Sequence, residues 1–160
     1  IFNLIGPLSS PAQVRRQVVG VFEKKWMKPF AEALKENNVT HAYIVHSDDG
    51  MDEISPFAKT NVVELKNGII SEFKIDPKEL GIKVSNRENL KGKNAKYNSE
   101  KIVEICKGKS NEFSQSVALN VAAGLIVAGE ENNFKEAFSN ALTHLQSGKV
   151  YEHLIKLQTY

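Results

Sequence analysis

The chain has 160 residues, of which 41% are hydrophobic and 25% are charged, and this balance is typical of one soluble globular domain. A formal net charge of +2 excludes a whole-chain field that would direct binding to nucleic acid or membranes. The single cysteine, Cys106, excludes an internal disulfide and a cysteine-rich metal site, so we expect a cytoplasmic protein.

The opening stretch NLIGPLSSPAQ, residues 3–13, predicts a stiff loop, because Gly6-Pro7 and Ser10-Pro11 are turn dipeptides. A loop of this kind can form the apolar wall of a pocket for a flat ring, or it can be a plain connector. Arg15 and Arg16 follow it, and they either face an anion or form a solvated pair.

A βαβ unit is predicted next. Residues 17–22 form a β-branched run that predicts a buried strand, and residues 26–38 predict a helix with Trp26 and Leu34 on one face. Residues 41–47 predict the second strand. Short connections between these elements favour a parallel pair of strands with a right-handed crossover.

A β-hairpin is predicted over residues 61–75. Asn67-Gly68 lies between two β-rich runs, and a type I′ turn needs positive φ at both central residues, which these two residue types tolerate. The antiparallel hairpin therefore follows the parallel unit.

The second half predicts helices after a polar, irregular stretch with short capped turns at residues 76–80 and 85–90. The apolar run 117–129 is too short to span a bilayer, which needs about 20 residues, and predicts a buried core helix. The helices are expected at residues 98–109 (capped by Asn98 or Ser99), 113–129 (ending at Gly129), 133–148 and 150–160.

Four acidic residues follow the second strand: Asp48, Asp49, Asp52 and Glu53. Ligands bind beyond the carboxyl ends of strands in open α/β sheets, and an adjacent Asp-Glu pair suits Mg²⁺, which takes oxygen ligands and keeps several waters. Alternatively, Asp52 and Glu53 lie in the first turn of a helix at 52–57, where its dipole stabilises each by about 0.3–1 kcal/mol. The residues alone leave both interpretations open.

The remaining polar residues give weaker signals. The spacing of the four histidines matches no metal motif, and we expect His46 to be a strand residue near the acidic loop. Residues 83–109 hold eight basic residues against three glutamates, which favours a solvated face over a nucleic-acid patch. No P-loop, nucleophile elbow or dinucleotide fingerprint is present.

Three segments in this order and spacing, IFNLIGPLSSPA, RRQVVGVF and HSDDGMDEIS, resemble the carboxyl-terminal half of the anthranilate phosphoribosyltransferase family. ALNVAAGLIVAG, with Asn120 inside it, matches the family's last core helix. The string GMDEIS is the most specific, because pyrimidine nucleoside phosphorylases share the fold but lack it. The resemblance implies an α/β fold of the nucleoside phosphorylase/phosphoribosyltransferase type: a mostly parallel central sheet, flanking helices and an added antiparallel hairpin.

The resemblance also implies a reaction and its residues. The family transfers the phosphoribosyl group from phosphoribosyl pyrophosphate to anthranilate in tryptophan biosynthesis, and Mg²⁺ is bound to the phosphates. By resemblance, Asp52 and Glu53 hold this Mg²⁺, and Gly6 and Pro7 line the anthranilate pocket. Displacement at the sugar carbon needs positioning and charge stabilisation, so no Ser, Cys or His nucleophile is expected.

Residues 1–160 are expected to be the carboxyl-terminal portion of the α/β catalytic domain, without the amino-terminal helical domain and the phosphate-loop region. The full-length enzyme is expected to be a homodimer, and the isolated chain to be inactive. Two loops depart from the family pattern: GPLSSP, with Ser9 and Ser10, replaces GPLTNP, and KGKN at 91–94 replaces GGD. The alternatives are a pyrimidine nucleoside phosphorylase of the same fold and a non-catalytic anion-binding module that uses residues 83–109.

Overall fold

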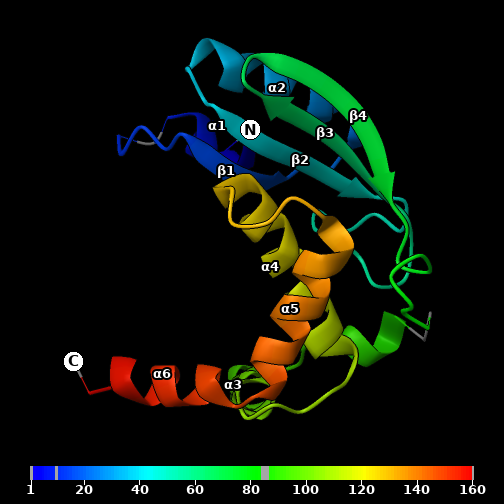
Figure 1. The fold of residues 1–160 in the computed structure, drawn as a ribbon, viewed down its shortest axis with the longest axis vertical. Coiled ribbons are helices and arrows are strands. Elements are labelled where there is room, and N and C mark those ends of the chain that lie inside the picture. Colours follow the sequence, from blue (N-terminus) through cyan, green and yellow to red (C-terminus); the bar gives the residue numbers. More distant parts are fainter. Residues whose placement is uncertain (1, 10, 84–86, 160) are drawn as a thin grey trace.

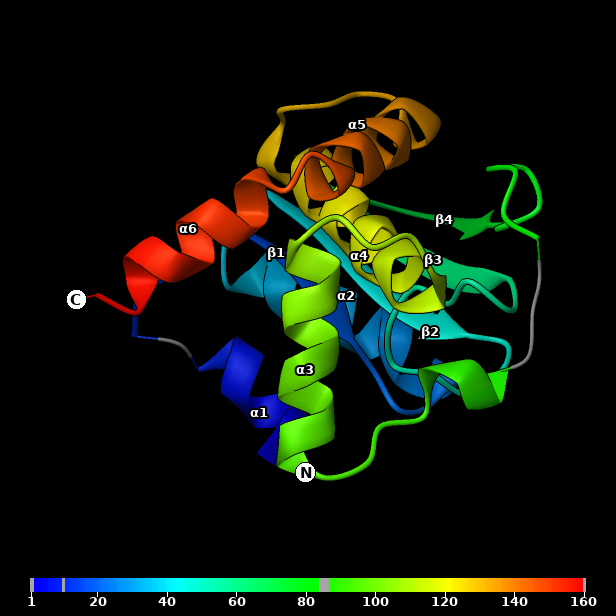
Figure 2. The same cartoon turned by 90° about the horizontal axis from the view of Figure 1, so that it is seen from below.

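The computed structural model describes residues 2–9, 11–83 and 87–159, and its elements form a four-stranded sheet with helices on both faces (Figures 1 and 2). The strands are β1 (Arg16–Gly20), β2 (His41–Ser47), β3 (Thr60–Lys66) and β4 (Ile69–Ile75). The helices are α1 (Phe2–Leu8), α2 (Met27–Glu36), α3 (Ala95–Cys106), α4 (Glu112–Ala128), α5 (Phe134–Gln146) and α6 (Lys149–Leu157), with short 3₁₀ turns η1 (Lys24–Trp26) and η2 (Arg87–Leu90).

The sheet has the order β1-β2-β3-β4 and is mixed. β1 and β2 are parallel, which confirms the predicted βαβ unit, and the other two pairs are antiparallel. The parallel part is thus smaller than expected, because the loop of residues 48–59 connects β2 to β3 without a crossover helix and reverses the chain direction. Within the described residues, the other edge of β1 has no partner strand, and such an open edge favours non-native association.

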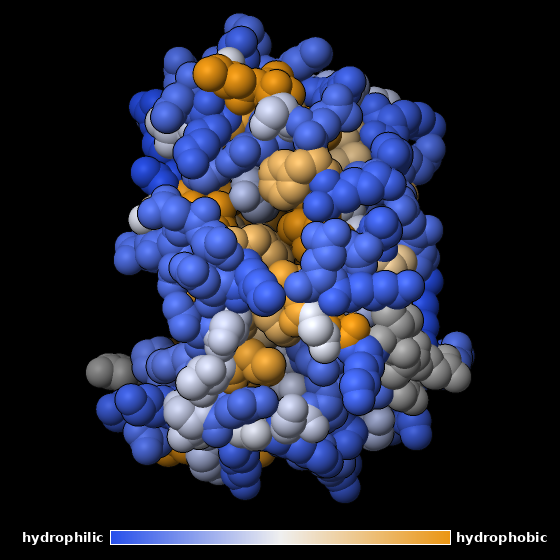
Figure 3. All heavy atoms as spheres, turned by 45° about the vertical axis from the view of Figure 1, so that its right-hand side comes forward, coloured by the Kyte–Doolittle hydropathy of each residue, from blue (hydrophilic) through white to orange (hydrophobic). Residues whose placement is uncertain are grey.

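The hairpin of β3 and β4 forms as predicted. Asn67 and Gly68 have φ of 50° and 80°, the positive values of a type I′ turn. β3 is largely buried, whereas β4 is an exposed edge strand whose Phe73 stacks edge-on against Tyr43 at 5.5 Å between ring centroids. Figure 3 shows one face of the molecule, where hydrophilic residues dominate and hydrophobic ones gather in a recess across the middle.

Two hydrophobic cores lie on the two faces of the sheet, because the side chains of β2 alternate between them. Tyr43 and Val45 join the core formed with α4 and α5, whereas Ala42 and Ile44 join the core formed with α2. All four are buried, so β2 is the central strand of the molecule and its carboxyl end is held firmly. Figure 2 shows α2 and α4 on opposite sides of the sheet.

α4 has the boundaries that its sequence favours. Asn111 caps it in a reciprocal capping box with Ser114, and Gly129 ends it at φ 85°, as predicted. None of the described helices is long and apolar enough to cross a membrane.

α3 begins earlier than predicted, and the expected cap at Asn98 or Ser99 is wrong. Asn94 caps it instead, with extended backbone and its side chain accepting a hydrogen bond from the backbone N–H of Tyr97 at 2.9 Å. The side chain of Asn98 accepts a hydrogen bond from the N–H of Lys93 at 2.9 Å, so it closes the preceding loop. The segment KGKN that departs from the family pattern therefore ends in the cap of α3.

The buried side of α4 should dominate its contribution to stability. Leu119 is completely buried, whereas Val117 on the same helix is 42% exposed. We expect Leu119→Ala to lower the free energy of unfolding by about 2–5 kcal/mol, because it leaves a cavity in the core. Val117→Ala is the matched control and should change it by no more than about 0.5 kcal/mol. Urea denaturation measures both, and equal losses would contradict this packing.

Candidate functional site

The four acidic residues lie in one loop that connects the end of β2 to the start of β3. Three backbone hydrogen bonds shape it: Ser47 N–H to Met51 O at 2.9 Å, Gly50 N–H to Ser47 O at 2.9 Å, and Asp48 N–H to Lys59 O at 2.8 Å. Because this loop follows the carboxyl end of a central strand, it lies where ligands bind in α/β sheets.

The predicted helix at 52–57 does not form, so the interpretation of Asp52 and Glu53 as first-turn helix residues is wrong. Pro56 disfavours helical backbone at Ser55. Ser55 instead donates its N–H to Thr60 Oγ1 at 3.1 Å, and its Oγ accepts the N–H of Phe57 at 3.0 Å. No helix dipole therefore offsets the charges of Asp52 and Glu53.

Asp48 and Asp49 already have partners within the protein. Asn61 Nδ2 donates to Asp48 Oδ1 at 2.6 Å, and Lys74 Nζ lies 3.3 Å from Asp48 Oδ2. The hydrogen bond from Asn61, supported by Lys74, lowers the pKa of Asp48. Asp49 accepts hydrogen bonds from Ser55 Oγ at 2.7 Å and from the backbone N–H of Met51 at 3.2 Å.

Asp52 and Glu53, in contrast, both reach the solvent although the Glu53 carboxyl is partly covered, and neither carboxylate has a hydrogen bond or ion pair in the part of the chain that the structure describes. Partial burial raises the pKa of Glu53, and the nearby carboxylates of Asp52 and Asp49 raise it further. These two neighbouring oxygen ligands with uncompensated negative charge fit a divalent cation.

The protein alone does not supply a complete set of metal ligands. Among the described residues, no group of three or more His, Cys, Asp or Glu side chains is arranged to hold a metal ion. Two carboxylates suit a Mg²⁺ that keeps waters and phosphate oxygens as its other ligands, whereas a structural zinc site needs about four protein ligands.

Gly20 allows β1 to approach this loop closely. A Cβ atom at residue 20 would lie 1.5 Å from the carbonyl oxygen of Asp52, a distance that no packing adjustment of a side chain can relieve. The sequence offers only a weak signal for this role, a glycine at the end of a β-branched run.

The loop has two further supports that the sequence did not identify. Asn120 of α4 hydrogen-bonds to both backbone groups of Ile54, and Arg87 Nη1 donates to Asp49 O at 2.7 Å. His46 lies at the end of β2 as expected, 2.9 Å from the carbonyl oxygen of Val21 through its Nδ1. These contacts join β1, β2, η2 and α4 to one loop.

The opening stretch is a helix up to Leu8 rather than the expected loop, whereas residues 11–13 are non-helical, as expected. α1 includes Gly6 and Pro7, because the fixed φ of proline is compatible with a helix and Ser9 N–H closes the last turn on Ile5 O at 3.0 Å. The change of Ser10 in GPLSSP falls outside the described residues. No atom approaches the position of a Cβ at Gly6 within 4 Å.

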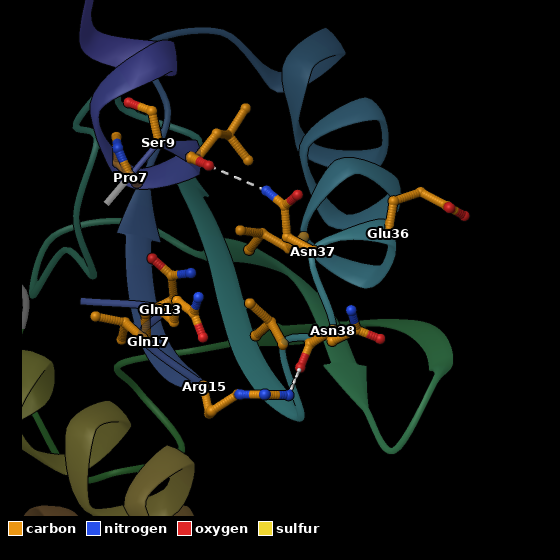
Figure 4. Close-up of a pocket in the computed structure, with 12 residues that line it drawn as sticks. Pro7, Ser9, Gln13, Arg15, Gln17, Glu36, Asn37 and Asn38 are labelled. Carbon is orange, nitrogen blue, oxygen red and sulfur yellow. Dashed lines mark hydrogen bonds between the residues drawn. The ribbon is translucent and has the colours of Figure 1, made fainter. Parts of the chain in front are cut away.

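Pro7 lines a cavity of about 410 Å³ between α1, the start of β1 and the end of α2 (Figure 4). Figure 4 shows Asn37 donating to Leu8 O and Arg15 to Asn38 O, at 3.0 Å each. This cavity is at the amino-terminal ends of β1 and β2, whereas the acidic loop is at the carboxyl end of β2. The structure therefore does not bring the two predicted parts of the site together.

The two arginines are both exposed, as the solvated interpretation expects, and they are not joined at one anion site. Arg15 binds the carbonyl oxygen of Asn38, after α2, and Arg16 Nη1 donates to Val127 O near the end of α4 at 2.7 Å. Each guanidinium thus binds the carbonyl end of a helix, where the helix dipole favours a cation.

The basic stretch 83–109 has its charges partly compensated. Lys101 and Lys109 both contact Glu104, at 2.9 and 2.8 Å, and Lys93 and Lys101 lie over the ring of Tyr97. These local partners favour the solvated face over an anion-binding surface.

A substitution at Gly20 tests the close approach of β1 and the loop. Gly20→Ala should destabilise the chain strongly, because its methyl group overlaps the backbone of Asp52. Gly124→Ala is the control: this exposed helical glycine has open space around it, and alanine should stabilise α4 by about 0.5–1 kcal/mol. Thermal unfolding of both variants checks this, and a harmless Gly20→Ala would refute the close approach.

The opposite pKa shifts of Glu53 and Asp48 predict opposite effects of neutralisation. The folded-state pKa of Glu53 is raised, so its stabilising contribution is present at low pH and is lost as the pH rises through that pKa. Glu53→Gln should therefore stabilise the chain at pH 7, with a smaller gain below about pH 4. The pKa of Asp48 is lowered, so its contribution is present at pH 7 and Asp48→Asn should destabilise. Urea denaturation at both pH values measures the change in the free energy of unfolding for each variant. A Glu53→Gln variant that is less stable than the native chain at pH 7 would contradict the finding that the Glu53 carboxylate has no favourable partner among the described residues.

Comparisons with known proteins agree with the α/β fold and with the family resemblance seen in the sequence. The anthranilate phosphoribosyltransferase of Pelagibacter ubique (strain HTCC1062) is 54% identical over 158 residues, which are 99% of this chain and 48% of that protein. The crystal structure of anthranilate phosphoribosyltransferase from Thermus thermophilus superposes with a TM-score of 0.87 at 33% identity, over 97% of this chain and 46% of that one.

The enzyme from Saccharomyces cerevisiae, solved in complex with PRPP and Mg, has a TM-score of 0.83 over 94% of this chain and 44% of its own, and its 24% identity shows the shared fold alone. The chain spans about half the length of the curated relatives it matches. The α/β fold and the resemblance seen in the sequence are confirmed. The family described as "Glycosyl transferase family, a/b domain" matches residues 1–151, and the chain belongs to this family.

Proposed function

We propose that this chain is part of an enzyme that transfers the phosphoribosyl group from phosphoribosyl pyrophosphate to anthranilate in tryptophan biosynthesis. The observation that carries the proposal is the Asp52–Glu53 pair in the loop after β2, which has no partner among the described residues. The name and 54% identity of the Pelagibacter ubique relative support the choice of substrates.

In this reaction the bond from the sugar C1 to a pyrophosphate oxygen breaks, and a bond from C1 to the anthranilate nitrogen forms with loss of a proton from the amine. A bound Mg²⁺ would supply positive charge that stabilises the negative charge on the leaving pyrophosphate. Asp52 and Glu53 would hold this ion through their carboxylate oxygens.

The protein's own contribution is mainly to position these carboxylates. Asn61, Lys74 and Ser55 engage the other two acidic side chains of the loop, which leaves Asp52 and Glu53 for the cation. No covalent nucleophile is required, because an aromatic amine attacks the sugar directly once it is held in line.

We also propose that Gly6 and Pro7 lie on the anthranilate side of the site, as the family resemblance implies. Pro7, but not Gly6, lines the cavity beside α1, and neither residue is brought to the acidic loop in this chain. Substitutions at these two residues should act on anthranilate rather than on the metal. A homodimer of the full-length protein and a cytoplasmic location are further proposals, which light scattering and cell fractionation test. The chain by itself is expected to be inactive.

Neutralising the pair tests the proposed function. In the full-length protein, Asp52→Asn combined with Glu53→Gln should reduce Mg²⁺-dependent turnover by more than about 100-fold, because both proposed protein ligands of the ion are lost. Asp48→Asn is the control in the same loop and should leave the Mg²⁺ concentration for half-maximal rate unchanged, since its carboxylate already binds Asn61 and Lys74.

An unchanged Mg²⁺ dependence in the double variant would contradict the proposed metal site. The rate with thymidine and phosphate, measured beside the rate with anthranilate and phosphoribosyl pyrophosphate, separates this function from that of a pyrimidine nucleoside phosphorylase. Cleavage of thymidine by phosphate, without phosphoribosyl transfer to anthranilate, would contradict the proposal and favour a pyrimidine nucleoside phosphorylase.

A further inference from the structure

We infer that Asn120 is a positioning residue that sets the affinity of the Asp52–Glu53 pair for a divalent cation, although its own side chain binds only the backbone. This inference rests on the proposed metal site and adds to it the part of the structure that holds the two carboxylates in place.

Asn120 lies on α4 and hydrogen-bonds to Ile54, the residue that directly follows Glu53. Its Oδ1 accepts the backbone N–H of Ile54 at 3.0 Å, and its Nδ2 donates to the backbone oxygen of Ile54 at 3.1 Å. The same Nδ2 donates to Ser116 O at 2.9 Å, one turn earlier in α4. One amide side chain therefore satisfies both polar groups of Ile54 and is itself anchored to its helix.

Because Ile54 is buried, its two hydrogen bonds to Asn120 are hard to replace. Ile54 is completely buried in the core with α4, so water does not readily replace Asn120 as the partner of its N–H and carbonyl groups. A buried backbone group that loses its partner costs about 1–3 kcal/mol. Asn120 is also the only polar residue from Val117 to Ala128, at a helix position where alanine would be intrinsically better.

The two hydrogen bonds orient the backbone that carries the carboxylates. The N–H of Ile54 belongs to the same peptide unit as the carbonyl group of Glu53. By binding this N–H, Asn120 fixes the orientation of the peptide plane between Glu53 and Ile54. On the other side of the loop, Gly20 lets β1 lie against the carbonyl oxygen of Asp52. The acidic pair is thus fixed between β1 and α4, and this opposes the repulsion between its like charges.

Loss of the two hydrogen bonds from Asn120 to Ile54 should therefore lower the affinity of the folded protein for the metal ion, beyond any loss of stability. Residues that orient metal ligands without touching the ion change metal affinity by about 10–100-fold when they are substituted. A residue that only stabilises the fold should leave the affinity of the folded molecules unchanged, and Leu119, buried beside Asn120, supplies that comparison.

The test uses the full-length protein, since this chain is expected to lack the phosphate-loop region, with Mn²⁺ and inorganic pyrophosphate as the probe. Bound Mn²⁺ broadens the NMR signals of nearby backbone amides, so a titration followed at residues 52–54 gives an apparent dissociation constant. The variants are Asn120→Ala, Asn120→Asp and the control Leu119→Ala. We expect Asn120→Ala to weaken binding by about 10-fold or more, and Leu119→Ala to change it by less than about twofold.

Amide hydrogen exchange at Ile54 provides the second readout. Asn120→Ala should abolish its protection, whereas Asn120→Asp keeps an acceptor for this N–H and should retain protection while losing the bonds from Nδ2. If Asn120→Ala does not fold, Asn120→Ser decides the question, because serine is uncharged and too short to bind both backbone groups of Ile54, and it still should weaken Mn²⁺ binding.

The outcomes separate this inference from the proposed function. Equal Mn²⁺ affinity in the native chain and the Asn120 variants would overturn the positioning role and leave the metal site standing. Equal weakening by Leu119→Ala and Asn120→Ala would show a general effect of stability and would also overturn it. Absence of broadening at residues 52–54 in the native full-length protein would overturn the metal site and the inference together.

Discussion

Two carboxylates that repel one another are held side by side without a partner in the described protein, and the arrangement of the loop around them follows from that constraint. Asp48 and Asp49 are drawn toward Asn61, Lys74 and Ser55, so their charges are partly offset. Asp52 and Glu53 are not, and the raised pKa of Glu53 reflects partial burial first and this crowding second. A folded protein retains such a pair most readily where a ligand supplies the missing positive charge.

The fold places this pair through the central strand. β2 is buried on both faces, between the core of α2 and the core of α4 and α5, so its carboxyl end is a rigid point from which the acidic loop starts. β1 runs parallel to β2 and ends in Gly20, where the loop passes closest. The same parallel arrangement puts the cavity beside Pro7 at the far end of the strands, away from the acidic loop (Figure 4).

Local signals in the sequence predicted most elements correctly. Asn67-Gly68 defined the hairpin turn, Gly129 the end of α4, and the β-branched runs the parallel pair, because each depends on the conformational preference of a few neighbouring residues. The mistakes have local causes as well: proline dipeptides suggested a loop where α1 forms, and Asn94, Asn98 and Ser99 are similar caps that only the folded chain distinguishes.

The residues that support the site were beyond prediction from sequence patterns. Gly20 matters because of Asp52, 32 positions later, and Asn120 because of Ile54, 66 positions earlier. No periodicity or motif contains such pairings, since they arise only when β1 joins the sheet and α4 packs on it. The residues alone left two interpretations of the acidic pair and the family resemblance implied the metal site, while the pair's lack of partners among the described residues is a structural finding.

The location of the cation tests the account most directly. A crystal of the full-length protein grown with Mn²⁺ and inorganic pyrophosphate would reveal the ion by its anomalous scattering. The account predicts a peak between the Asp52–Glu53 pair and the pyrophosphate, with one carboxylate bound directly or through a single water. A fully occupied peak beside Asp48 and Asp49, or pyrophosphate bound with Asp52 and Glu53 left bare, would contradict it.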